Sequence, residues 1–322
     1  MNIYISRYVF YISFFVGCLF TNLVAQNDEE VIIYVKNISN EIHDGNNVLS
    51  KAHTYGKSWD TAFRHLHDAL RFGDPNATQM WIAGGHYYVD SGIALTTQTT
   101  SEASPSSRHM SPYLVLNRNL KIYGGFAGTE TSLDQRDPEA NPTYLDGNVY
   151  YKDRHDFPVP DNVFGAVNKF SKRIMVAYNS TLTLDGLIFQ YVYGGDTSAS
   201  GSTLISEPEL GNGAFVLTHQ SALTINNCLF RYATVGYQGQ MVHETNSTEP
   251  LRITNSRFTE SGNTDSFFYI TNEAVSGSVI FENNIFDNLQ TSIDNSRNRF
   301  FKIPLGLGVS SVTEIKNSLF YN

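Results

Sequence analysis

The chain has 322 residues, with 22 Lys and Arg against 31 Asp and Glu, and a formal charge of −9 at neutral pH. Charged residues make up 16% of the sequence and aromatic residues 13%, a balance that excludes a disordered, collagen-like or coiled-coil chain. No run of basic residues is present that could follow a phosphate backbone, so we expect no nucleic-acid partner.

Residues 1–25 have the pattern of a secretory signal peptide. One basic residue, Arg7, precedes an apolar stretch, and the small residue Ala25 is followed by a polar segment. We expect cleavage near Ala25, a protein that is secreted or held at the outer cell surface, and no transmembrane span in the mature chain. Two alternatives stay open: a retained membrane anchor, and a lipid anchor on Cys18. The apolar residues after Cys18 argue against the lipid anchor.

Cys228 is the only other cysteine, so the mature chain cannot form an internal disulfide. The residue lies inside a repeated motif whose other copies have Leu, Ser or Asn at the same place. A small buried residue of the core is therefore the favoured interpretation. A catalytic thiol is the alternative.

The only convincing helical periodicity lies within 58–72. Apolar residues recur there at helical spacing from Trp59 onward. Ser58 is a good N-cap, and Gly73, followed by Asp-Pro, ends the pattern. We therefore predict one amphipathic helix over this segment.

Neither the two histidines of the predicted helix nor the two glycine pairs that follow short strands indicate a ligand site. His65 and His67 are two residues apart and therefore face different sides of a helix, so we expect surface positions rather than a shared metal site. The glycine pairs Gly84-Gly85 and Gly124-Gly125 follow short predicted strands and open no helix. They predict sharp bends, not phosphate-binding loops.

The second half of the chain repeats one motif five times, which is the strongest signal in the sequence. In each copy, alternating apolar residues precede a Gly or Asn that interrupts the alternation, and a short second strand with a Phe follows. The interrupting residues are Gly186, Asn227, Asn255, Asn283 and Asn317, and the aromatic residues are Phe189, Phe230, Phe258, Phe286 and Phe320. Because Asn tolerates left-handed dihedrals and can both donate and accept, we expect corners with stacked amides. The Phe residues are expected to form an internal column.

A further strand is predicted before each of the first four copies, at 174–177, 214–217, 241–242 and 267–270. Two or three short strands per repeat predict an all-β fold, a right-handed single-stranded parallel β-helix with coils ~4.8 Å apart. We expect this domain to span 26–322, with an N-terminal strand and capping helix in 26–75 and the coils in 76–322. Because an uncovered end would be an open edge, we expect the last coil to be covered by a partner or a loop, unless the chain is a truncated product.

Three segments resemble the N-terminal half of secreted bacterial right-handed β-helix proteins of the pectate-lyase-like superfamily. They read YGKSWDTAFRHLHDAL, MWIAGGHYYV and LKIYGGFAGTETSLDQRDPEANPTYLDGN. The later copy FENNIFDN is similar to the repeats of chlamydial polymorphic outer-membrane proteins. The resemblance covers roughly residues 31–322 and implies a fold and an extracellular, often cell-surface, location. It implies no activity, because one fold hosts many functions.

The catalytic patterns of such proteins are incomplete in this sequence. Asn263-Thr264-Asp265 matches one element of polygalacturonase-like hydrolases, but the later elements are absent, and inverting hydrolysis needs a second carboxylate. A turn is the favoured interpretation. Arg297 and Arg299 resemble the arginine motif of the lyases only loosely, and elimination would also need several carboxylates around calcium.

The densest polar and aromatic cluster is the segment 150–156. A sugar could stack on its tyrosines and bond to its polar groups, and the candidate ligand-binding residues are Tyr150, Tyr151, Asp153, Arg154 and His155. Weaker candidates for a calcium site are Asp146, Asp153 and Asp156, and we expect no other cofactor. A solvated insertion between coils is the alternative interpretation of this segment.

Three classes of function stay open. The first choice is a non-catalytic secreted or cell-surface β-helix that acts in adhesion or binds a polysaccharide or cell-surface glycan. The second is a polysaccharide lyase or glycoside hydrolase, and the third is a structural spacer. Acidic residues that converge on one face would favour the enzyme.

Overall fold

The structure is a computed structural model that describes part of the chain. The described residues are 30–37, 55–89, 112–148, 170–171, 173–194, 214–235, 241–244, 251–263, 266–271, 279–291, 299–302 and 313–321. The predicted signal peptide, 1–25, lies outside them. The chain divides into the units 1–30 and 31–322, and everything below concerns the second.

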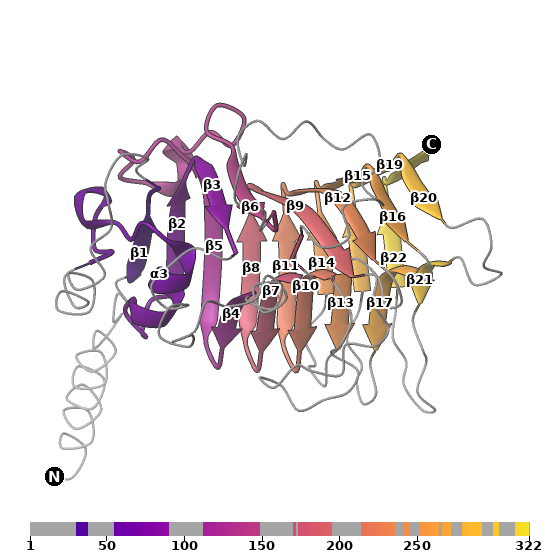
Figure 1. Cartoon of the computed structure of the whole chain (residues 1–322), viewed down its shortest axis with the longest axis horizontal. Helices are drawn as coiled ribbons and strands as arrows, with labels where there is room; N and C mark the ends of the chain where they lie inside the picture. Colours follow the sequence, from indigo (N-terminus) through magenta and orange to yellow (C-terminus); the bar gives the residue numbers. More distant parts are fainter. Residues whose placement is uncertain are drawn as a thin grey trace, which may run out of the picture. The chain divides into compact units, whose positions relative to one another are not determined.

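Strands dominate the described residues and form three sheets, here named A, B and C (Figure 1). Sheet A contains β1 (Ile32–Val35), β2 (Gln79–Ala83), β5 (Asn119–Phe126), β8 (Thr181–Asp185), β11 (Ala222–Asn226), β14 (Leu251–Thr254), β18 (Val279–Glu282) and β22 (Thr313–Lys316). Sheet B contains β3 (Gly85–Tyr88), β6 (Thr143–Asp146), β9 (Leu187–Gly194), β12 (Leu229–Val235), β15 (Arg257–Thr259), β19 (Ile285–Asp287) and β23 (Leu319–Tyr321), with β16 (Ser261–Asn263) and β20 (Leu289–Thr291) alongside. Sheet C contains β4 (Tyr113–Leu116), β7 (Arg173–Tyr178), β10 (Ala214–His219), β13 (Met241–Glu244), β17 (Ser266–Thr271) and β21 (Arg299–Lys302).

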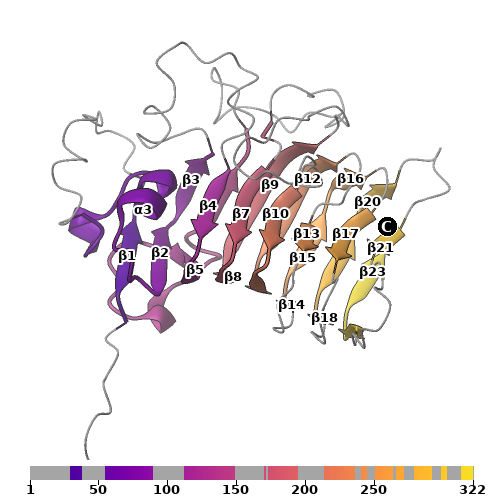
Figure 2. The ribbon, with the colours of Figure 1, turned by 90° about the horizontal axis from the view of Figure 1, so that it is seen from below.

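The chain visits the three sheets in a fixed order. From β7 onward each strand of sheet C is followed by one of sheet A and then one of sheet B. Every pairing within the sheets is parallel, for example β7 with β10 and β8 with β11. Figure 2 shows the strands of successive repeats side by side along each sheet. The prediction of an all-β protein with parallel strands in a repeated order is confirmed.

The predicted helix over 58–72 is wrong in its extent. A 3₁₀ turn, η1 (Trp59–Thr61), begins at Ser58, which forms a capping box with Thr61. The chain then extends, and Phe63 forms a parallel bridge with Val35. The α-helix, α3, covers only Leu66–Phe72, and it ends before Gly73 as predicted. The backbone of Phe63 bonds to β1 instead of to a helical turn, because its N–H donates to the carbonyl of Tyr34 at 2.9 Å.

Helix α3 lies at the N-terminal end of sheet C. It packs against β1 and β4, the first strand of that sheet. His67 of α3 is buried, in contrast to the surface position predicted for it. Its Nε2 lies 2.6 Å from the carbonyl oxygen of Val89, and its ring contacts Tyr113 at 4.5 Å between centroids. His67 thus ties the helix to the sheets, and His65, its N-cap, is half-buried.

The predicted aromatic column is confirmed on the inner side of sheet B. Successive rings stack with centroid separations of 4.8, 4.6, 5.2 and 4.7 Å along Phe189, Phe230, Phe258, Phe286 and Phe320. The first four are buried, whereas Phe320 is 49% exposed. The column continues toward the N-terminal end through Leu145 and Tyr87, which occupy the same register position.

The predicted corners between sheets A and B are also confirmed. Gly186, Asn227, Asn255, Asn283 and Asn317 all have positive φ, between 48° and 69°. The predicted amide stack is only partly present. Asn283 donates to Asn255 at 3.2 Å, but Asn255 donates to Asn226 instead of Asn227. The pair Gly124-Gly125, where a sharp bend was predicted, forms a bulge within β5, because Tyr123 pairs with Trp81 while Phe126 pairs with Ala83.

Replacing Phe258 by Ala should destabilise the protein strongly. The ring stacks between Phe230 and Phe286 and is 1% exposed, so its removal should cost roughly 3 to 5 kcal/mol of unfolding free energy. Phe320→Ala is the matched control, since the half-exposed ring should cost only about 1 kcal/mol. Equal losses in urea melts would contradict a buried column.

The corner at Asn255, with φ of 50°, provides a second test. Asn255→Ala should be roughly 1 kcal/mol less stable than Asn255→Gly, because a left-handed conformation penalises Cβ. Both variants lose the amide, so their difference reports backbone strain. At Asn226, which has no positive φ, the Ala variant should be at least as stable as the Gly variant. A stability order at Asn255 that matches Asn226 would refute strain at the corner.

Candidate functional site

Most of the predicted site residues cannot be placed. The segment 150–156, with Tyr150, Tyr151, Asp153, Arg154, His155 and Asp156, lies outside the described residues, as do Thr264, Asp265 and Arg297. Asn263 is the last residue of β16, and Arg299 is the first of β21. The binding role predicted for 150–156 and the turn predicted for 263–265 stay predictions.

Asp146 is the one calcium candidate that the structure describes, and protein donors surround its carboxylate. Oδ1 accepts the backbone N–H of Asn148 at 2.8 Å. Oδ2 accepts the amide of Gln190 at 2.7 Å and lies 3.3 Å from Nδ1 of His86. The side chain is almost fully buried. Within the described ranges no three His, Cys, Asp or Glu residues come close enough to hold a metal ion.

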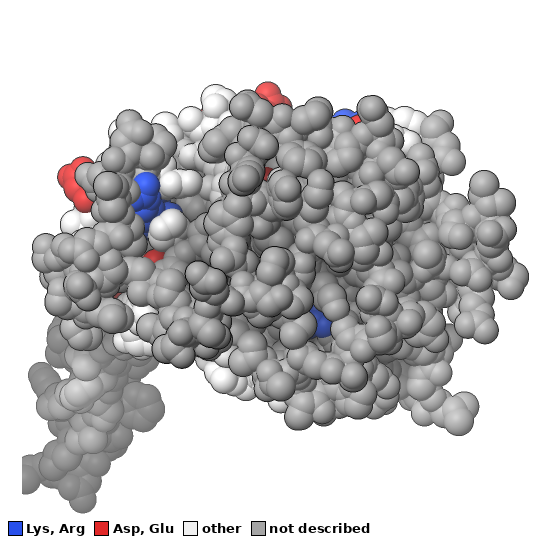
Figure 3. All heavy atoms as spheres, in the orientation of Figure 1, with Lys and Arg blue, Asp and Glu red and all other residues white. Residues whose placement is uncertain are grey.

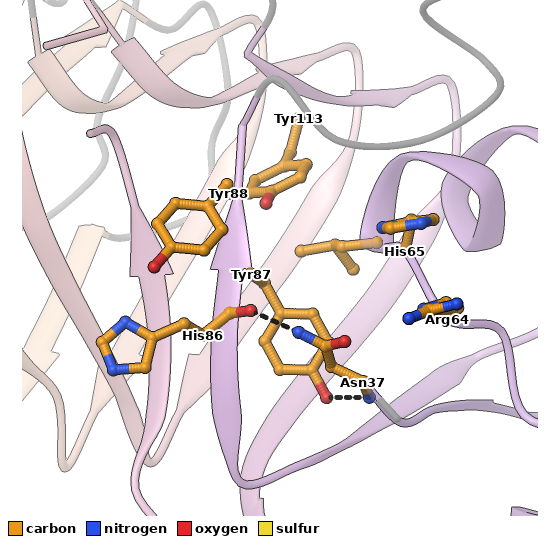
Figure 4. A pocket seen from close by; sticks show the side chains of 8 residues that line it. Asn37, Arg64, His65, His86, Tyr87, Tyr88 and Tyr113 are labelled. Carbon is orange, nitrogen blue, oxygen red and sulfur yellow. Dashed lines mark hydrogen bonds between the residues drawn. The ribbon is translucent and has the colours of Figure 1, made fainter. Parts of the chain in front are cut away.

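A pocket opens beside β3, where that strand faces the segment leading into α3 (Figure 4). It is partly open to solvent, and a water-sized group can occupy about 30 Å³ of it. We call it the β3 pocket, and its lining residues are Asn37, Arg64, His65, Leu66, His86, Tyr87, Tyr88 and Tyr113. Figure 4 shows Arg64 and His65 on one side and His86 and Tyr88 on the other.

Hydrogen bonds hold the floor of the β3 pocket in place. The backbone N–H of Asn37 donates to the Tyr87 hydroxyl at 3.1 Å, and its amide donates to the carbonyl oxygen of His86 at 2.8 Å. The Tyr87 hydroxyl donates in turn to Ala83 at 2.9 Å. Burial raises the pKa of Tyr87 well above its usual range, so this hydroxyl remains a neutral structural donor.

Aromatic rings extend from the pocket onto the outer side of sheet B. His86 stacks on Tyr144 of β6 with 4.2 Å between centroids and 15° between planes. The guanidinium of Arg231 lies 5.9 Å from the Tyr144 ring on the other side, and the Gln190 oxygen fixes it through bonds of 2.9 and 3.1 Å. We call His86 and Tyr144, both half-buried, the ring platform.

On the face seen in Figure 3, the described Lys, Arg, Asp and Glu side chains appear singly or beside opposite charges. Two arginines are paired, Arg136 with Asp185 at 2.6 Å and Arg257 with Asp287 at 2.7 Å. No helix in the described part of the chain is long and apolar enough to cross a membrane.

Comparison with protein-family models, with curated proteins and with solved structures finds no match in any of the three.

Sequence reasoning missed the β3 pocket because its residues come from four separate segments. The one available signal was the run His86-Tyr87-Tyr88, which places an imidazole and two phenols on a single short strand. The same run belongs to MWIAGGHYYV, the segment that resembles the β-helix proteins, and alone it predicts a strand and no site.

Cys228 behaves as a buried core residue, as predicted. It is 4% exposed, and its thiol donates to the carbonyl of Asn226 at 3.2 Å. Burial raises the pKa of the Cys228 thiol to about 12. A thiolate is therefore scarce at neutral pH, which disfavours the catalytic alternative.

Native protein with Cys18→Ser should resist alkylation at Cys228. Burial raises the pKa of this thiol and keeps it protonated at pH 8.5, so iodoacetamide should label it only after denaturation. Mass spectrometry of native and guanidinium-treated samples measures the difference. Rapid stoichiometric labelling of the native protein would show a reactive thiol and reopen the catalytic interpretation.

Proposed function

We propose that the protein is a secreted or cell-surface right-handed parallel β-helix that binds glycans without cleaving them. The β-helix part is supported by the constant order of sheets C, A and B and by the parallel register between repeats. The stacked ring column on the inner side of sheet B supports it as well. Export is supported by the sequence pattern of residues 1–25.

The observation that carries glycan binding is the β3 pocket with the ring platform at its edge. Sugar sites combine flat rings, against which the C–H face of the sugar packs, with polar groups that bond to hydroxyls. His86 and Tyr144 offer such a surface, and Arg64, His65 and Asn37 line the adjoining hollow. The Asp146 carboxylate that orients His86 is held by Gln190 and Asn148, so the platform is prepared before any ligand arrives.

Removing one ring of the platform tests this function. Tyr144→Ala should weaken binding on a glycan array about tenfold, because stacking is the main attraction that this side chain offers. The matched control is Tyr178→Ala, which breaks a similar stack with His219 (5.1 Å) on sheet C. Undiminished binding in Tyr144→Ala, or equal losses in both variants, would contradict the site.

The same preparation tests the absence of cleavage. Incubation with pectin, alginate and glycosaminoglycans, with and without calcium, should release neither reducing ends nor unsaturated uronate. Sustained turnover on any of them would favour the lyase or hydrolase alternative. Tyr150→Ala with Tyr151→Ala, measured on the array, tests the segment that the sequence singles out.

A further inference from the structure

The β3 pocket has the charge pattern of a site for anions. Among the described residues, its lining contains one arginine and two histidines and neither Asp nor Glu. This is unusual in a chain with 31 acidic residues against 22 Lys and Arg. A carboxylate or sulfate that enters the pocket therefore meets donors and no repelling carboxylate among the lining residues that the structure describes.

Arg64 is the centre of this pattern. It is half-buried, and no hydrogen bond or ion pair joins it to another residue in the described structure. Arg136 and Arg257, by contrast, each pair with an aspartate at 2.6 to 2.7 Å. A partly desolvated guanidinium without a counter-ion is costly, and its planar fork matches carboxylate and sulfate oxygens.

The two nearby carboxylates that the structure describes do not line the pocket. Asp68 of α3 and Asp146 of β6 belong to adjoining elements, but neither lines the pocket. Asp68 is 1% exposed and Asp146 is 2% exposed. Asp146 is also held by Gln190 and Asn148, so it is committed to the polar network of sheet B.

The size of the pocket restricts what can enter. The space inside it that a water-sized group can occupy is about 30 Å³, far below the ~300–1,000 Å³ of sites for drug-sized ligands. The hollow therefore suits a single acid group, and the sugar ring that bears it would lie at the mouth. Further sugar residues would lie outside, where the ring platform borders the mouth through His86.

We propose that the β3 pocket receives the acid group of an acidic sugar, a uronate carboxylate or a sulfate ester, with Arg64 as the residue that selects for it. The proposal rests on the glycan-binding function and adds the chemical class of the ligand to it. Binding involves no covalent step. Hydrogen bonds from Arg64 to two oxygens of the acid group make acidic sugars bind more tightly than neutral ones.

The test uses three sugars that share one ring and differ at C6: D-galacturonate, D-galactose 6-sulfate and D-galactose. Titration of the purified protein, followed by calorimetry or saturation-transfer NMR, should give at least tenfold tighter binding for one or both acids than for galactose. The two acids separate a carboxylate site from a sulfate site. The preference should shrink as sodium chloride rises from 50 to 500 mM.

Variants at Arg64 and Arg71 test whether the preference for acidic sugars depends on Arg64. Arg64→Gln should abolish the preference, so that galacturonate, galactose 6-sulfate and galactose bind equally. Arg64→Lys should restore part of the preference, because it keeps the charge but loses the fork. Arg71→Gln is the matched control, since it removes the same charge from exposed Arg71 of α3, which does not line the pocket. Thermal melts of each variant confirm folding.

The possible failures are distinguishable. If the array shows binding but acidic and neutral sugars bind equally, or if Arg71→Gln matches Arg64→Gln, the acid site is wrong while glycan binding stands. If neither the array nor the three sugars give binding, the proposed function fails together with the inference.

Discussion

The structure depends on one recurring hydrogen bond at its corners. At several corners, the residue after the left-handed position turns its backbone N–H toward the next repeat, where a side-chain oxygen accepts it. Between sheets A and B these bonds join Cys228 to Ser256 (3.1 Å), Ser256 to Asn284 (2.9 Å) and Asn284 to Ser318 (3.2 Å). Because strands with a period of two tolerate no slip of one residue, this bond keeps inner and outer faces separate along the stack.

The candidate site depends on this alignment of the strands from repeat to repeat. Tyr87, Leu145 and Phe189 occupy one register position on neighbouring strands and face inward. The residues just before the first two, His86 and Tyr144, therefore share the outer face and can stack. The position after Tyr87 becomes the polar row of Asp146, Gln190 and Arg231. Ordinary parallel pairing between repeats therefore assembles a polar and aromatic surface from residues that are 41 to 60 positions apart in the chain.

The sequence predicted the features that depend on local pattern. The phenylalanine column and the left-handed corners follow from alternation and from a phase break at Gly or Asn, as Phe258 and Asn255 show. It failed where a distant partner overrides local preference. Phe63 leaves the helical pattern to pair with β1. His67 is buried, with its ring nitrogen at the carbonyl oxygen of Val89. Arg64 gave no signal, because only the folded chain brings it opposite β3.

The ring spacing in the phenylalanine column has a consequence for how the molecule opens. Separations of 4.6 to 5.2 Å are close to the ~4.8 Å distance between paired strands, so every repeat can add one ring without distortion. Each ring then interacts mainly with the repeats directly above and below, as in a one-dimensional array of nearest neighbours. Opening should propagate from the half-exposed repeat of Phe320 toward Phe230, and amide exchange should slow in that order.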